Sequence, residues 1–141
     1  MIPVLRLIYR KDDSPDNVFI KNIVRENAYA GIYFRDENDA NAGHRNRFEE
    51  NIIEDNGRPD APGYGVRIEG ATHNLKLTSN TIRSAAKGTK AIQPVGIYIG
   101  PAADFVTCDH NIFGGDLKQA IVDKPKGGHN HLDQPTAKPA N

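Results

Sequence analysis

Short apolar runs recur along this chain at a nearly constant spacing, and polar turns separate each run from the next. An asparagine precedes an apolar pair or near-pair four times, at intervals of 29, 29 and 31 residues: Asn22, Asn51, Asn80 and Asn111. A small residue opens a second apolar run downstream of each asparagine: Gly31, Gly65, Gly96 and Ala120. A third set lies three positions before each asparagine: Phe19, Phe48, Leu77 and Cys108. Three columns that keep one order through four copies indicate an internal structural repeat.

The apolar runs alternate with polar residues at a period of two, as in Gly65-Val66-Arg67-Ile68-Glu69-Gly70, which is typical of β-strands. Apolar stripes of helical period and length are missing from the sequence. Short strands separated by turns predict a solenoid, in which each strand lies about 4.8 Å from its copy and parallel to it. We therefore expect an all-β chain of about four coils, each with about three strands. Two inward ladders are expected: Ile32, Val66 and Ile97, and Phe48, Leu77 and Cys108.

The asparagine column has a structural interpretation of its own. In a solenoid the four asparagines lie at one corner, where stacked side-chain amides hydrogen-bond along the axis of the stack. Cys108 belongs to an inward column, so we expect a buried and unreactive thiol there. A single cysteine also excludes an internal disulfide.

This pattern resembles the right-handed parallel β-helix repeat of the pectate-lyase-like superfamily. In that repeat a Gly-Ile-x-Ile strand, a variable loop, a second strand, an Asn-bearing turn and a third strand make one coil. The resemblance covers residues 5–123 and implies a right-handed, single-stranded parallel β-helix, in agreement with the right-handed crossovers that dominate parallel sheets. It is specific for the fold and not for an activity, because many unrelated functions share this coil.

The domain organisation follows from the extent of the repeat. We expect one β-helix domain over residues 1–123, with residues 4–9 as a strand of an earlier coil, and a loop and C-terminal tail over residues 124–141. No amphipathic capping helix is recognised in the sequence. Because an uncapped solenoid exposes strand edges, we expect a section of a longer β-helix, a homo-oligomer or end-to-end association.

Charge and composition narrow the classes of partner. The 141 residues include 18 Lys and Arg and 18 Asp and Glu, so the chain has no basic footprint for nucleic acid. No apolar run approaches the ~20 residues that span a bilayer, and we expect no membrane partner. The opening residues lack the pattern of a signal peptide, whereas the family resemblance suggests an extracellular or cell-surface location.

The outward face of the glycine-led strands carries the candidate chemistry. Alternation places Tyr33, Arg67 and Tyr98 in one outward column, and Arg35 and Glu69 in a second. Three neighbouring strands span roughly 10 Å, about the length of a disaccharide. Aromatic faces stack on sugar rings and arginine binds a carboxylate through two N–H groups, so we predict that an acidic, uronate-containing polysaccharide binds to Tyr33, Arg35 and Tyr98. Ordinary cross-strand pairing of exposed residues is the alternative explanation.

Cleavage of the same polysaccharide is a further hypothesis. In the resembled family, lyases use this face: a cation neutralises the uronate carboxylate, and a lysine or arginine removes the adjacent proton. Here the catalytic candidates are Arg67 as base and Glu69, which orients Arg67 or acts as an acid. Arginine is effectively always protonated, so it serves as a base only in an unusual environment. The alternative function is a non-catalytic β-helix segment, such as a spike or adhesin-like stalk or a carbohydrate-binding module.

The sequence lacks the catalytic motifs of several enzyme groups in the resembled superfamily, so it does not predict any of those specific activities. The sequence lacks the paired Asp and Gly-His-Gly of polygalacturonases, the Arg-x-Pro-x-x-Arg of pectate lyases and the Asp-Pro-His of alginate epimerases.

Metal ligands are sparse in the sequence, and no metal ligand set is predicted. Ca²⁺ is the one cofactor considered, because Asp36-Glu37-Asn38-Asp39 offers oxygen ligands; the ordered spacing of a calcium loop is absent, and a solvated loop is favoured. His129-Asn130-His131 supplies two imidazoles, fewer than a zinc site needs. Asp109-His110 lies at the asparagine corner and is interpreted as a turn.

Overall fold

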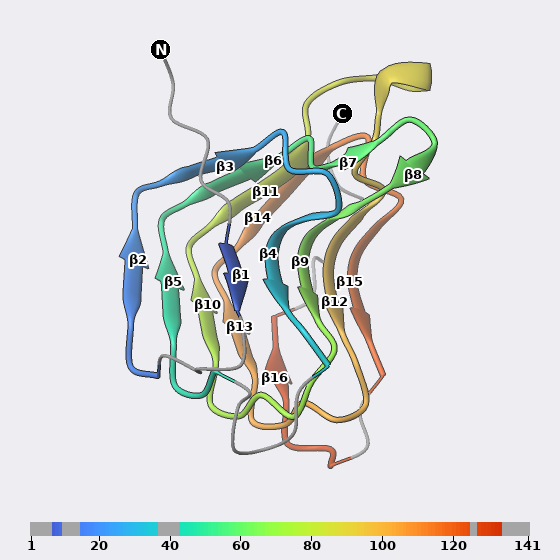
Figure 1. Cartoon of the computed structure of the whole chain (residues 1–141). Coiled ribbons are helices and arrows are strands. Elements are labelled where there is room, and N and C mark those ends of the chain that lie inside the picture. Colours follow the sequence, from blue (N-terminus) through green and yellow to red (C-terminus); the bar gives the residue numbers. More distant parts are fainter. Residues whose placement is uncertain (1–6, 10–14, 37–42, 125–126, 134–141) are drawn as a thin grey trace.

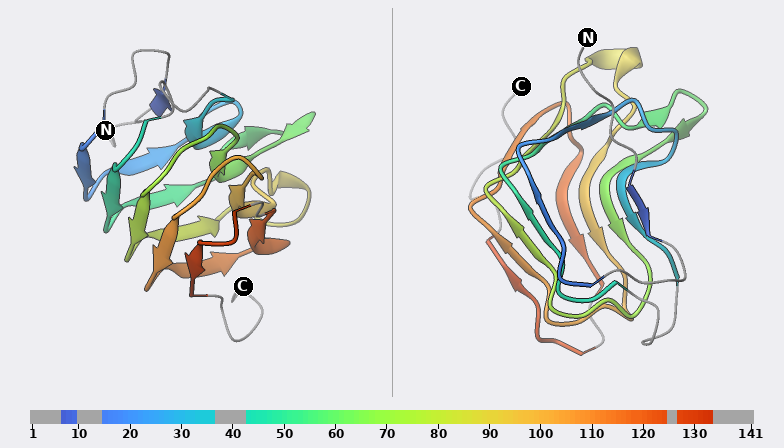
Figure 2. Two further views of the ribbon diagram at one scale, coloured as in Figure 1. Left: turned by 90° about the horizontal axis from the view of Figure 1, so that it is seen from below. Right: turned by 60° about the vertical axis from the view of Figure 1, so that its left-hand side comes forward.

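The computed structural model describes residues 7–9, 15–36, 43–124 and 127–133 of the chain. Three parallel sheets form the walls of a β-helix, and the coils stack from the N-terminal to the C-terminal strands (Figures 1 and 2). Sheet A contains β1 (Leu7–Tyr9), β4 (Ala30–Phe34), β9 (Tyr64–Ile68), β12 (Val95–Ile99) and β15 (Gln119–Asp123). Sheet B contains β2 (Val18–Ile20), β5 (Arg47–Glu49), β10 (Lys76–Thr78), β13 (Thr107–Asp109) and β16 (His131–Leu132). Sheet C contains β3 (Ile23–Arg25), β6 (Ile52–Glu54), β11 (Thr81–Ser84) and β14 (Ile112–Gly115).

The chain visits the sheets in the order B, C, A, and the described strands make four complete coils. The expected all-β solenoid is thereby confirmed. Two small additions interrupt the regular path between sheets C and A: a hairpin of β7 (Gly57–Arg58) and β8 (Ala61–Pro62), and a 3₁₀ turn at Gly88–Lys90. Both lie in the longer loops of the middle repeats.

The ends of the stack extend beyond the complete coils. β1 pairs with β4 in parallel, which bears out an earlier glycine-face strand, and the register sets Leu7 and Tyr9 opposite Ile32 and Phe34. Residues 4–6 of the expected strand lie outside the described residues. At the other end, the segment expected to be a loop and tail contributes a strand, because β16 pairs with β13 in parallel. Two strand residues between Gly-Gly and proline carry too little pattern for the sequence to predict them.

Apolar ladders fill the interior as the alternation predicts. Ile32, Val66 and Ile97 have no exposed surface, and neither do Phe48, Leu77 and Cys108. Burial raises the pKa of the Cys108 thiol far above its ordinary value, so this side chain stays an uncharged core residue. Phe19 stacks on Phe48 with ring centroids 4.7 Å apart. Successive copies of one position therefore pack on each other along the axis.

The predicted asparagine ladder occupies the corner between sheets B and C. In each step the Oδ1 atom of one asparagine accepts two hydrogen bonds from the preceding one: Asn51 donates to Asn80 through its backbone N–H and its Nδ2, both at 3.0 Å. Asn80 in turn donates from Nδ2 to the carbonyl oxygen of Phe48 at 2.9 Å. The residue before each rung has a left-handed conformation: Lys21, Glu50, Ser79 and His110, with φ between 54° and 58°. The asparagine amides thus satisfy backbone groups that the sharp corner removes from the sheets.

A second polar ladder, which the repeat count does not reveal, lies at the corner between sheets C and A. Asn27 donates to the Oδ1 of Asn56, and the backbone N–H and Nδ2 of Asn56 donate to the Oε1 of Gln93 at 3.0 and 2.9 Å. Gln93 lies 37 positions after Asn56, whereas Asn27 and Asn56 are 29 apart. A glutamine thus continues an asparagine ladder after an insertion, and its longer side chain reaches the same acceptor position.

The outer strands carry exposed apolar side chains. Val18 and Ile20 on β2 are 44% and 47% exposed, and Ile112 on β14 is 64% exposed. Association through these ends stays a prediction. Among the described residues, no helix has the length and apolar character needed to cross a membrane.

Replacing Ile97 by alanine is expected to lower the free energy of unfolding by about 2–5 kcal/mol, because a fully buried side chain leaves a cavity in its ladder. Chemical denaturation followed by circular dichroism measures this loss. A loss below about 0.5 kcal/mol would mean that Ile97 does not pack in the core.

Replacing Asn80 by alanine is expected to cost about 2–4 kcal/mol, because the Phe48 carbonyl oxygen and the Asn51 amide group lose their partners inside the protein. The exposed Asn74 at another corner, where φ is 61°, provides the control: Asn74→Ala affects only the conformational preference of the turn. If Asn80→Ala lost no more unfolding free energy than Asn74→Ala, the hydrogen bonds of the asparagine ladder would add no stability beyond that of an ordinary turn residue.

Candidate functional site

The outer face of sheet A gathers four tyrosines around one ion pair, which we name the tyrosine cluster. It consists of Tyr29, Tyr33, Tyr64, Tyr98, Arg67 and Glu69. The parallel register sets Arg67 directly opposite Tyr33 on one neighbouring strand and opposite Tyr98 on the other. The predicted outward column is therefore present as a set of adjacent side chains.

Arg67 lies among aromatic rings. The guanidinium carbon is 4.3 Å from the ring centroid of Tyr98, 4.4 Å from that of Tyr64 and 5.7 Å from that of Tyr29. A guanidinium above an aromatic face is attracted by the negative charge of the ring surface. With 18% of its side chain exposed, Arg67 is held in place from several directions.

Glu69 connects the arginine to two tyrosine hydroxyl groups. Its carboxylate accepts a hydrogen bond from Nε of Arg67, from the Tyr33 hydroxyl at 2.6 Å and from the Tyr29 hydroxyl at 3.3 Å. The donors lie on two neighbouring strands of sheet A: Arg67 on β9, Tyr33 on β4 and Tyr29 immediately before β4. The carboxylate therefore fixes the positions of the aromatic side chains as well as that of Arg67.

Tyr64 belongs to the cluster although strict alternation along β9 would turn it inward with Val66 and Ile68. The alternation breaks at Gly65: a Cβ there would lie 2.9 Å from the buried Ile82 side chain, so both Gly65 and Val66 face the interior. Tyr64 and Arg67 consequently share the outer face. The glycine that opens the apolar run was the available signal, since glycine inside a strand often marks an irregularity.

Tyr29 is also not among the predicted outward residues, because it lies at the corner immediately before β4 and not on the strand. Its ring meets those of Tyr33 and Tyr64 edge to face, with centroids 5.0 and 5.7 Å apart. It is 39% exposed, whereas Tyr33, Tyr64 and Tyr98 are half-buried. The cluster thus offers aromatic surface to the solvent from a rigid sheet.

Both members of the ion pair are charged at neutral pH. Burial acts to lower the pKa of Arg67, but the hydrogen bond and charge of Glu69 raise it above its ordinary value. Burial acts to raise the pKa of Glu69, yet hydrogen bonds from Tyr33 and Arg67, with the arginine charge, leave that pKa below its ordinary value. A protonated guanidinium cannot accept a proton and an ionised carboxylate cannot donate one, so neither residue is in the state required for the catalytic role of base or acid expected from the sequence.

The hydroxyl groups of Tyr29 and Tyr33 are also protonated at neutral pH. Burial, opposed by the charge of Arg67 and supported by that of Glu69, raises the pKa of Tyr29 to about 12. Burial and the hydrogen bond to Glu69 raise the pKa of Tyr33 further. Both hydroxyl groups therefore act as neutral hydrogen-bond donors.

The remaining predicted residues lie at the margin of this site. Arg35 is exposed and follows β4, beside Glu69 in the ladder, since the Glu69 amide donates to the carbonyl oxygen of Phe34. Asp36 is exposed, and the rest of the loop considered for Ca²⁺, residues 37–39, lies outside the described residues.

Glu69 gives the cluster an expected acid sensitivity. Because its pKa is lower in the folded state, the unfolded chain binds more protons below pH ~4.3, and stability falls as the pH falls through this range. Between about pH 6 and about pH 3, wild type should lose more unfolding free energy than Glu69→Gln, which cannot titrate. Urea unfolding at both pH values measures the difference. Parallel losses in the two proteins would show that Glu69 is not stabilised in its charged form.

The comparisons with known proteins agree with this architecture. A family model described as "right handed beta helix region" matches residues 8–113, which include the tyrosine cluster. No curated protein and no solved structure shows a significant match to the chain. The matched region covers most of the sequence and three of the four complete coils, and this chain therefore belongs to the right-handed β-helix family.

Proposed function

We propose that the tyrosine cluster binds a glycan without cleaving it. The observation that carries the proposal is the gathering of four tyrosine rings around a charged pair on the outer face of a parallel sheet. Aromatic rings provide apolar surface for the faces of sugar rings, and tyrosine hydroxyl groups provide hydrogen bonds at the edges. A rigid sheet lowers the entropy lost when such a ligand binds.

The polar part of the cluster suits sugar hydroxyl groups. The Glu69 carboxylate accepts hydrogen bonds, and the terminal nitrogens of Arg67 are donors. Because the two opposite charges lie in contact, the pair attracts a uronate carboxylate less than an isolated arginine would. We therefore expect neutral and uronate oligosaccharides to bind with similar affinity, in place of the marked uronate preference that the sequence suggested.

The cluster is poorly suited to cleavage by β-elimination, because its one carboxylate, Glu69, already accepts hydrogen bonds from Arg67, Tyr33 and Tyr29. Elimination requires a base that accepts a proton, and the pKa of Arg67 is raised. The carbohydrate-binding module predicted as the alternative to a lyase is thus the better proposal for this face.

Calorimetric titration with cello-, xylo- and galacturonate hexasaccharides tests the proposal. Tyr98→Ala and Arg67→Ala should each lower the affinity for the tightest-binding oligosaccharide at least ~10-fold, about 1.4 kcal/mol. Each substitution removes part of the surface on which a sugar ring would stack. Phe105→Ala is the matched control: Phe105 is 49% exposed at another corner, and its loss should leave affinity unchanged.

Two results would overturn the proposal. One is the absence of binding by wild type to every oligosaccharide tested. The other is an equal loss of affinity in the Phe105→Ala control. Formation of unsaturated product from the galacturonate oligomer, followed by ultraviolet absorbance, would contradict the non-catalytic part.

A further inference from the structure

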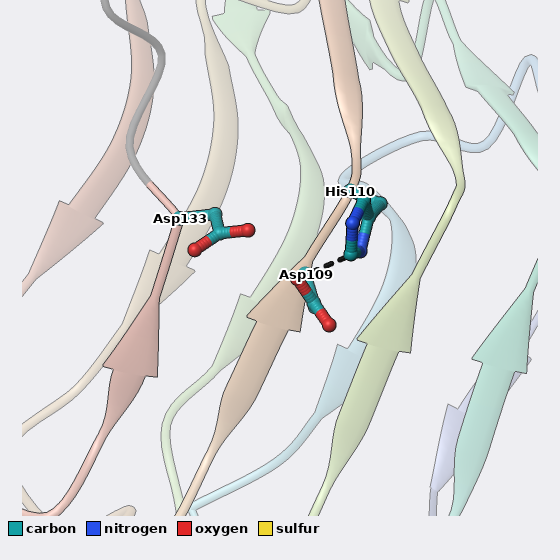
Figure 3. Close-up of side chains that lie close together, drawn as sticks. All are labelled: Asp109, His110 and Asp133. Carbon is teal, nitrogen blue, oxygen red and sulfur yellow. Dashed lines mark ion pairs between the residues drawn. The ribbon is translucent and has the colours of Figure 1, made fainter.

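A second group of polar side chains gathers at the C-terminal end of sheet B, whereas the tyrosine cluster lies on sheet A. Asp109 ends β13, His110 follows it at the corner and Asp133 follows β16; Figure 3 shows these side chains from neighbouring strands. Each residue offers one potential ligand atom, and these three atoms lie within 4.8 Å of one another. The Nδ1 atom of His110 is 2.8 Å from a carboxylate oxygen of Asp109.

The register of the sheet places the two carboxylates directly opposite each other. β13 and β16 pair Thr107 with His131 and Cys108 with Leu132, and the Asp133 amide continues this ladder to the Cys108 carbonyl oxygen at 2.9 Å. Like charges that lie directly opposite on adjacent strands destabilise the pair. Earlier in the same outward column, the register sets Thr78 between Glu49 and Asp109. The last step of the stack therefore brings two carboxylates together beside the imidazoles of His110 and His131, an arrangement of ligand atoms that a cation would draw together.

The donor atoms indicate the class of cation. Two carboxylates and one imidazole suit Zn²⁺ and related divalent transition metals, whereas Ca²⁺ and Mg²⁺ prefer oxygen ligands alone. His131 is a fourth candidate ligand, because its Nε2 lies 3.8 Å from the Asp133 carboxylate. The side chains of Asp109 and His110 are 35% and 75% exposed, so rotation can bring their ligand atoms to the roughly 2.0–2.2 Å that zinc requires.

We propose that Asp109, His110 and Asp133 form a binding site for a divalent transition metal of the zinc class, which fastens β16 to the end of the β-helix. β16 has two residues, and the backbone amides of His131 and Asp133 hold it to Val106 and Cys108 by hydrogen bonds of 2.9 Å each. Leu132 packs against the core beside these bonds. The metal links the residue after β16 to the corner after β13, and so stabilises the terminal strand over the buried Cys108.

Titration of the untagged protein with ZnCl₂ alone tests binding, and hydrogen exchange of single amides tests the role in fastening β16. Wild type should bind one zinc ion, and saturating zinc should slow exchange of the His131 and Asp133 amides at least ~10-fold. The Arg47 amide, bonded to the Asn17 carbonyl oxygen at the opposite end of sheet B, should not change.

Two conservative variants separate metal binding from folding. Asp133→Asn removes the charge pair and should fold at least as well without metal, but should bind zinc at least ~10-fold more weakly. His110→Asn suits the left-handed corner, where φ is 54°, and should lose affinity similarly. His129→Ala is the control, because His129 pairs instead with Asp104 at 2.8 Å.

Absence of zinc binding by wild type would overturn the proposal, as would unchanged affinity in Asp133→Asn and His110→Asn. Loss of binding in His129→Ala would place the metal elsewhere. Ca²⁺ binding as tight as that of Zn²⁺ would contradict the role of the imidazole. Zinc binding without slower exchange at His131 and Asp133 would refute the fastening of β16.

Discussion

Amide stacking at the corners is the interaction on which this β-helix depends. A chain that turns from one sheet into the next must leave the extended conformation, and here non-glycine residues adopt left-handed conformations at successive corners. Such conformations cost about 1–2 kcal/mol for an ordinary residue. Where an asparagine follows, as at the corner between sheets B and C, it compensates, because its amide bonds both to the neighbouring coil's asparagine and to a backbone carbonyl group. Without these bonds the corner between sheets B and C would bury unpaired backbone groups in each coil.

Once the corners are fixed, the rest of the interior follows from repetition. Each coil presents the same inward positions, so Ile32, Val66 and Ile97 meet as copies of one position. The Asn27–Asn56–Gln93 ladder shows how an insertion is accommodated: the loop grows outside the stack, and a longer amide restores the contact inside. Variation in this chain therefore appears in loops and on outer faces, where binding surfaces are built.

The tyrosine cluster and the Asp–His–Asp group use the rigid stack in two ways. In the cluster, a parallel register brings Tyr33, Arg67 and Tyr98 together, and Glu69 holds two hydroxyl groups and the guanidinium in one network. At the C-terminal end, the same register forces Asp109 and Asp133 to face each other. In the cluster, one carboxylate collects three donors in a single network, whereas at the C-terminal end two carboxylates and an imidazole offer ligand atoms within 4.8 Å of one another.

The sequence by itself determined the repeat, the strand period, the asparagine corner and the inward ladders, because each depends on contacts between equivalent positions of neighbouring coils. It also placed Tyr33, Arg67, Tyr98 and Glu69 on one face. Only the tertiary structure decided that Tyr64 joins them, since the break at Gly65 depends on how closely β9 approaches Ile82 of another sheet. The charge states of Arg67 and Glu69, and the meeting of Asp133 with Asp109 through a two-residue strand, were likewise decided in three dimensions. These features arise from distances between side chains on different strands, which no pattern within a single strand encodes.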